Sequence, residues 1–162
     1  QYKPTVLVLN KWDLVPEGTD PEEFGEYLTR ELRGFDYAPI VLVSAESAEG
    51  IEDVVSMAFN LREQAAHRET TGKLNAIIES ILKQRGPSSR LGTQAKLLYV
   101  SQVAVDPPTI AMVVNDPKLF EGRYERYLMN RLREEMPYSE VPIRLLFSKR
   151  TRKSLQDLKT RQ

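Results

Sequence analysis

The segment Asn10–Asp13 combines an amide, a cation and a carboxylate directly after the apolar run Thr5–Leu9. A second apolar run, Ile40–Val43, is followed by Ser44-Ala45. Both runs are short and rich in β-branched residues, which is typical of strands buried on both faces of a parallel sheet. Ligands of open α/β sheets bind outside the carboxyl ends of the strands. We therefore expect the two polar segments to face one pocket.

A carboxylate at this position suits guanine. Guanine presents two adjacent donors, N1–H and the exocyclic amino group, and the ionised side chain of Asp13 can accept both. Adenine has no proton on N1 and no donor on C2, so it would leave the carboxylate facing a lone pair. A site built around such a hydrogen bond rejects the wrong base by up to about 10⁴-fold.

The two segments resemble the Asn-Lys-x-Asp and Ser-Ala base-recognition motifs of Ras-like GTPases. By this resemblance, the stem of Lys11 lies over the base with its ammonium near the ribose. Asn10 contacts the base and ties its loop to the phosphate loop. The N–H of Ala45 donates to guanine O6, and Ser44 braces Asp13. The alternative is a polar turn after a strand, in which Asp13 caps the next segment.

The rest of a nucleotide-hydrolysing site is missing from the sequence. It contains no Gly-x-x-x-x-Gly-Lys-Ser/Thr loop, no recognisable metal-contacting Thr loop and no recognisable Asp-x-x-Gly. These elements bind phosphate and Mg²⁺ and stabilise the transition state of phosphoryl transfer. The chain is expected to hold the guanine-selecting half of a site, with no catalytic or metal-binding residue, and to hydrolyse nothing alone.

The elements that would position this half-site form a β-α-β-α pattern. One helix is predicted over Pro21–Leu32, with Asp20 as N-cap and an apolar stripe. A second is predicted over Ile51–Ala66. Its predicted buried side consists of Val54, Val55, Ala58, Leu61 and Ala65. Two strands make a narrow sheet, so its other strands are expected before Gln1 or in another chain, and a dimer through the free sheet edge is possible.

The second half follows a different, α-β-β-α-β pattern. The sequence predicts a helix around residues 74–82, strands over 95–105 and 109–114, a helix over 124–136 and a final strand over 141–147. Asp106-Pro107-Pro108 joins the first two strands in a hairpin. A basic tail is predicted from Ser148. The fold class is thus α/β followed by α+β.

Five stretches of the second half carry a longer resemblance. They are Thr71–Asn75, Leu97–Thr109, Val113–Phe120, Tyr124–Arg133 and Val141–Phe147. These stretches are similar to the C-terminal KH-like domain of the bacterial Der (EngA) GTPase family. The resemblance covers nearly all of residues 1–150 and implies three segments: a partial Ras-like P-loop GTPase domain over 1–68, a KH-like domain over 69–150 and a basic tail over 151–162.

The resemblance also implies a function. Der proteins have two tandem GTPase domains and a KH-like domain, and they act in assembly of the large ribosomal subunit. GTP or GDP with Mg²⁺ is expected in the intact protein, which would be cytoplasmic. Its partners would be ribosomal RNA, the large subunit and its own GTPase domains, with no membrane. A usual KH domain clamps RNA with Gly-x-x-Gly, which is absent here.

The charge distribution points to the same partner. Residues 1–68 carry 6 basic and 13 acidic side chains, a net charge of −7, and residues 69–162 carry +7. Lys149, Arg150, Arg152 and Lys153 form a cluster suited to phosphate backbones. The alternative is a solvated tail without a partner.

Two other functions stay open at this point. One is an Era-type GTPase with an RNA-binding KH domain, against which the missing Gly-x-x-Gly loop argues. The other is a non-enzymatic docking module for RNA or protein, whose Asn-Lys-x-Asp is incidental. The absence of cysteine and the single histidine, His67, exclude disulfide scaffolds, thiolate chemistry and His-pair metal sites.

Overall fold

The computed structural model describes residues 2–32, 34–87 and 94–150. The described elements, in chain order, are β1 (Leu7–Leu9), η1 (Trp12–Leu14), α1 (Pro21–Glu31), β2 (Ile40–Leu42), α2 (Ile51–Ala66), α3 (Thr71–Gln84), β3 (Leu97–Ala104), β4 (Thr109–Val114), η2 (Pro117–Leu119), α4 (Arg123–Glu135) and β5 (Arg144–Lys149). Among these elements, no helix combines the length and apolar character needed to cross a membrane.

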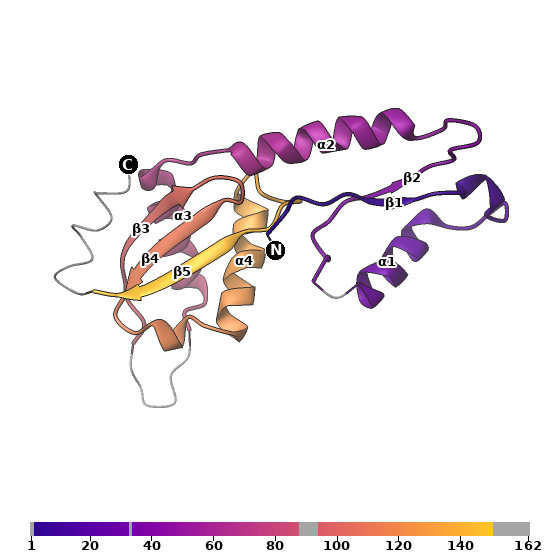
Figure 1. Ribbon diagram of the computed structural model, residues 1–162. Coiled ribbons are helices and arrows are strands. Elements are labelled where there is room, and N and C mark those ends of the chain that lie inside the picture. The colour runs from indigo at the N-terminus through magenta and orange to yellow at the C-terminus, as the bar shows by residue number, and fades with distance from the viewer. Residues whose placement is uncertain (1, 33, 88–93, 151–162) are drawn as a thin grey trace.

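In the N-terminal part, β1 and β2 pair in parallel as a two-stranded sheet (Figure 1). The register sets Leu7 beside Ile40 and Leu9 beside Leu42, so the segments after both strands start at one edge. The predicted parallel pairing and intervening helix are confirmed. Asp20 caps α1 as predicted, since its Oδ1 accepts the N–H of Glu22 at 2.9 Å.

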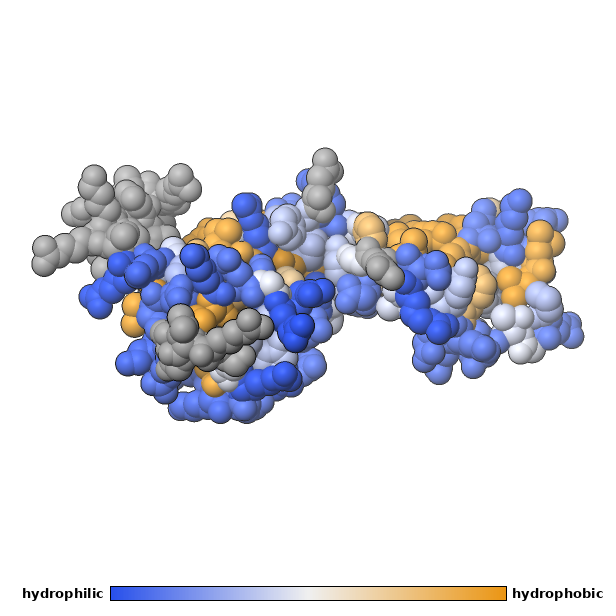
Figure 2. Space-filling model, turned by 90° about the horizontal axis from the view of Figure 1, so that it is seen from below, coloured by the Kyte–Doolittle hydropathy of each residue, from blue (hydrophilic) through white to orange (hydrophobic). Residues whose placement is uncertain are grey.

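The predicted burial of this part is only partly confirmed: Val41 and Val43 of the second apolar run are buried, but other predicted positions are exposed. Val8 in β1 is 45% exposed and α1 has no buried residue. On α2, Val55 is 53% exposed, whereas Leu61 and Ala65 near the end of the helix are buried. A two-stranded sheet is too narrow to cover the apolar faces of two helices. Figure 2 shows the resulting hydrophobic surface over this part, on the right.

The C-terminal part is a three-stranded sheet in the order β3-β4-β5. β3 and β4 form the predicted antiparallel hairpin, and β5 pairs with β4 in parallel. The last strand begins at Arg144 instead of residue 141, and Pro142 just before it has no N–H to donate to a ladder. Ser148 and Lys149 belong to β5, so the predicted start of the tail at Ser148 is wrong.

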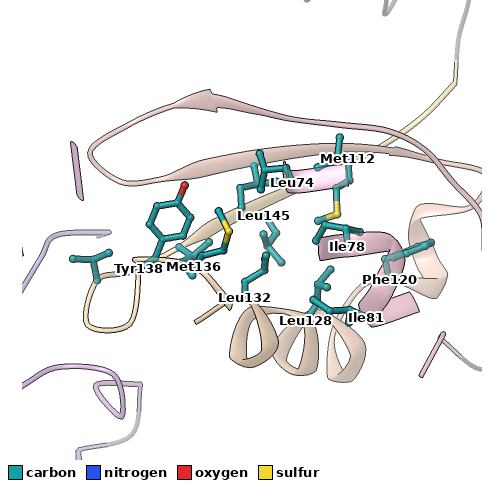
Figure 3. Close-up of a cluster of buried hydrophobic side chains, with 14 of the residues drawn as sticks. Leu74, Ile78, Ile81, Met112, Phe120, Leu128, Leu132, Met136, Tyr138 and Leu145 are labelled. Carbon is teal, nitrogen blue, oxygen red and sulfur yellow. The ribbon is translucent and has the colours of Figure 1, made fainter. Parts of the chain in front are cut away.

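Helices α3 and α4 cover one face of this sheet and bury a continuous core (Figure 3). Leu74, Ile78 and Ile81 of α3 meet Leu128 and Leu132 of α4, and all five side chains are at most 1% exposed. Burial of one such side chain stabilises the fold by about 2 kcal/mol. Among the described residues, none of the buried side chains of this core comes from β1 or β2.

The end of α2 is fixed to the C-terminal part. Leu61 and Ala65 join its core, and the carbonyl of Ala65 accepts the N–H of Asp106 at 2.9 Å. Gln64 makes two hydrogen bonds to Glu140, one through its Nε2 to Oε2 and one through its Oε1 to the backbone N–H. One helix therefore links the loop after β2 to the second core, as Figure 1 shows along the top of the molecule.

A buried glutamine holds the segment between α2 and α3. Oε1 of Gln102 accepts from the backbone N–H of Glu69 at 2.7 Å and from the hydroxyl of Tyr138 at 2.9 Å. Its Nε2 donates to the carbonyls of His67 at 2.8 Å and Ala104 at 3.2 Å. The hydrogen bond from Lys73, together with that from the Thr70 backbone, lowers the pKa of Glu69 to about 2.

Candidate functional site at the strand ends

Asn10 builds the turn that follows β1. Its Oδ1 accepts the N–H of Lys11 at 2.8 Å, and Lys11 adopts the left-handed conformation with φ 66°. That backbone region is uncommon for residues other than Gly, Asn and Asp. The backbone N–H of Trp12 then donates to the carbonyl of Val43 at 3.0 Å, and this hydrogen bond joins the turn to the end of β2.

The same Asn10 oxygen joins the two predicted motifs. It also accepts the N–H of Ala45 at 3.1 Å, across 35 residues of sequence. The expectation that both segments meet at one sheet edge is therefore confirmed by geometry. In the described chain this Ala45 N–H, predicted to donate to guanine O6, already has an acceptor.

The carboxylate of Asp13 lies on the short helix η1 and is exposed. Trp12 supports η1 by packing against Phe24 of α1, with ring centroids 6.0 Å apart at 74°. Within the described residues, no hydrogen bond or ion pair engages the Asp13 carboxylate. Among the described residues, both of its oxygens therefore remain without a protein partner.

Ser44 is buried, with 1% exposure, but its hydroxyl has another role than the one predicted. Its Oγ accepts the N–H of Ser47 at 3.2 Å, and its backbone N–H donates to the carbonyl of Glu49 at 3.0 Å. The predicted bracing of Asp13 by Ser44 is not among the hydrogen bonds of the described residues. Ser44 instead shapes the loop that presents the Ala45 N–H.

Gly50 closes this loop onto β2, and its replacement by Ala is expected to destabilise the protein by about 2 kcal/mol or more. Its φ is 74°, and an added Cβ would lie 2.3 Å from the carbonyl oxygen of Leu42. Urea unfolding of the Gly50→Ala variant measures the loss. Gly72→Ala is the matched control, because a Cβ there would have no heavy atom within 4 Å. Equal unfolding free energies for the two variants would contradict the close approach at Gly50.

Comparison with known proteins decides the family. Residues 68–148, half of the chain, match the family described as KH-domain-like of EngA bacterial GTPase enzymes, C-terminal. The chain belongs to the EngA (Der) family. The predicted KH-like α+β unit is thereby confirmed, while the partial Ras-like GTPase domain remains a prediction.

Curated relatives match over a longer stretch than the KH-like unit. The chain is 34% identical over 151 residues to GTPase Der of Rhodopirellula baltica, an alignment that covers 93% of this chain and 33% of that protein. It is 36% identical over 152 residues to GTPase Der of Desulforudis audaxviator, covering 93% and 35%. The chain thus spans about a third of the length of these relatives, and the alignments extend beyond the KH-like unit.

The predicted basic cluster is only partly described. Lys149 ends β5 opposite Val114, and it and Arg150 are exposed. Arg152 and Lys153 lie outside the described residues. Within residues 2–32, 34–87 and 94–150, no group of three or more His, Asp or Glu side chains could hold a metal ion.

Sequence reasoning missed two residues of the strand-end site. The close approach of Gly50 to β2 has only a weak signal, a lone glycine before a helix. Trp12 had a clearer sequence signal, because a large aromatic side chain inside a polar motif commonly packs on a neighbouring element.

Proposed function

We propose that this chain supplies guanine recognition to a GTP-binding protein of the EngA (Der) family. The observation that carries the proposal is the Asn10 side chain, whose Oδ1 accepts the N–H groups of both Lys11 and Ala45. These two hydrogen bonds bring the segment that carries Asp13 and the segment that carries Ala45 together at one sheet edge, which supports the proposal. The base-recognition roles of Asn10, Lys11, Asp13 and Ala45 are thus part of the proposal, and Ser44 contributes by shaping the loop that carries Ala45.

GTP and GDP are the nucleotides this site would select in the full-length protein, with Mg²⁺ bound by elements that the sequence in hand does not contain. The residues here would select guanine and hold the loop geometry, and they would not perform phosphoryl transfer. Hydrolysis of GTP is therefore proposed only for the full-length protein.

The KH-like unit is proposed as the docking part of the protein, in the cytoplasm, for ribosomal RNA of the large subunit during ribosome assembly. The family and the net charge of +7 over residues 69–162 support this partner. Contacts between side-chain cations and phosphates carry little sequence information, so the binding is expected to be sequence-tolerant. Two other uses of these surfaces compete with this proposal. The KH-like unit could pack on GTPase domains of the same protein, and the free edge of β1 could pair with another copy of the chain.

A salt series tests the contribution of the basic cluster. Replacement of Lys149, Arg150, Arg152 and Lys153 by Gln is expected to weaken binding to ribosomal RNA and to flatten its salt dependence. Each lost phosphate contact reduces the magnitude of the negative slope of log K against log salt by about 0.7 to 0.9. Filter binding measures both values, and a slope equal to that of wild type would exclude the cluster as an RNA contact.

A further inference from the structure

A cavity of about 510 Å³ lies where the N-terminal part meets α4. Its walls come from Tyr2, from the loop between α1 and β2, from α4 and from Pro142 and Ile143 just before β5. The α4 wall consists of Arg126, Met129, Asn130 and Arg133. A volume of this size accommodates a small ligand or part of a larger one.

The polar groups of this wall share one helix face. Arg126, Asn130 and Arg133 stand at positions i, i+4 and i+7, so the Cα atoms of the two arginines are offset along the helix by about 10 Å, a span that their long side chains can close. Arg126 is exposed, and within the described residues its side chain has no ion pair or hydrogen bond. Asn130 adds an amide between the two cations.

Arg133 is held in place by a ring and a carbonyl, and the carboxylate of Asp36 acts on its charge from a longer distance. Its guanidinium stacks on the ring of Tyr37 at 4.7 Å, and its Nη1 donates to the carbonyl of Val141 at 3.1 Å. Asp36 is the acidic residue of the cavity lining, and it forms no ion pair with Arg133 among the described residues. Burial lowers the pKa of Arg133, as expected for a cation drawn partly out of water.

We propose that this cleft binds a phosphate group, held between the guanidinium groups of Arg126 and Arg133 with the amide of Asn130 beside it. Arginine offers planar, paired donors that match phosphate oxygens, and a partly desolvated cation that forms no direct ion pair gains from an anion, although the carboxylate of Asp36 in the lining opposes that anion. The phosphate belongs either to an RNA backbone or to a free nucleotide. The RNA source rests on the function proposed above.

Binding of fluorescein-labelled oligouridine to the full chain, followed by anisotropy, tests the RNA source. Arg126→Gln is expected to weaken binding about fivefold, which is the contribution that one ion pair at the protein surface can make. It should also reduce the magnitude of the slope of log K against log salt by about 0.7. Asp36→Asn, which removes the acid from the lining, is expected to strengthen binding. Arg62→Gln on the exposed surface of α2 removes the same charge elsewhere and should leave the affinity near that of wild type.

Inorganic phosphate tests the cleft without RNA. The Nε–H NMR signals of Arg126 and Arg133 should shift on titration in wild type, and the Arg133 shift should diminish in Arg126→Gln. Phosphate shifts without RNA binding would support the cleft with a free nucleotide as the source and contradict the RNA-docking function. RNA binding that Arg126→Gln and Arg62→Gln weaken equally would overturn the cleft and leave RNA docking intact. If the chain neither binds the RNA nor shows phosphate-induced shifts, the phosphate-binding cleft and the RNA-docking function are both excluded.

Discussion

Replacement of Asp13 by Asn should abolish the preference of the full-length protein for GDP over ADP. A carboxylate accepts hydrogen bonds from both N1–H and the exocyclic amino group of guanine. The amide of Asn has one acceptor and would set its NH₂ against the amino group of the base. Loss of this match can cost up to about 10⁴-fold in discrimination. Competition of GDP and ADP against a fluorescent guanine nucleotide measures the ratio.

Two controls sharpen this test. Xanthosine diphosphate carries an oxygen on C2 in place of the amino group, so the Asn variant should bind it more tightly than wild type does. Glu46→Gln removes an equal charge from the exposed loop after Ala45 and should leave the GDP preference unchanged. An Asp13→Asn variant that still prefers GDP would favour the interpretation of Asn10–Asp13 as a simple polar turn.

The Gln102→Leu variant should have the largest effect on stability, with a loss of about 3 kcal/mol in the free energy of unfolding. Gln102 is 5% exposed and makes four hydrogen bonds, with the Glu69 N–H, the Tyr138 hydroxyl and the carbonyls of His67 and Ala104. Leucine would leave the buried Tyr138 hydroxyl and three part-buried backbone groups without these partners, at a cost of about 1–3 kcal/mol for a buried unpaired group. Urea unfolding of the chain measures the difference.

Graded variants separate this network from simple loss of packing. Tyr138→Phe removes one hydrogen bond and should cost about 1 kcal/mol. In the double variant, Gln102→Leu with Tyr138→Phe, the combined loss should be smaller than the sum, because the phenol no longer needs a partner. Val103→Ala, at a 39% exposed position of the same strand, serves as the control and should change stability little. Strict additivity of Gln102→Leu and Tyr138→Phe would argue against a shared network.

The network matters to the proposed function because it fixes the segment that joins α2 to α3. α2 begins next to Gly50 at the strand-end site and ends in the C-terminal core through Leu61 and Ala65. α2 thus connects the loop after β2 directly to the core of the KH-like unit.

Much of the local structure could be predicted from the sequence. The bounds of α2 and β4 agree with the apolar patterns, and the Asp106–Pro108 segment lies in the predicted hairpin. α2 has a strong local signal because its amphipathic period is ended by a polar segment. β4 has one because its apolar run is bounded by prolines and polar residues. Site residues placed at strand ends were predictable for the same reason.

Features that depend on distant neighbours could not be predicted. Exposure of Val8 and Val55 depends on how many strands the sheet has, which the pattern of one strand cannot reveal. The hydrogen bond between Asn10 and Ala45 spans 35 residues, and the stacking of Arg133 on Tyr37 joins two units. These contacts follow from tertiary packing, which overrides local preference.

The most direct test of guanine recognition is a crystal structure of the full-length protein with GDP. We expect both carboxylate oxygens of Asp13 within hydrogen-bond distance of N1 and the exocyclic amino group, and the N–H of Ala45 turned from Asn10 Oδ1 toward O6, or shared between them. Guanine bound elsewhere, with Asp13 still exposed and Ala45 still donating only to Asn10, would contradict the account.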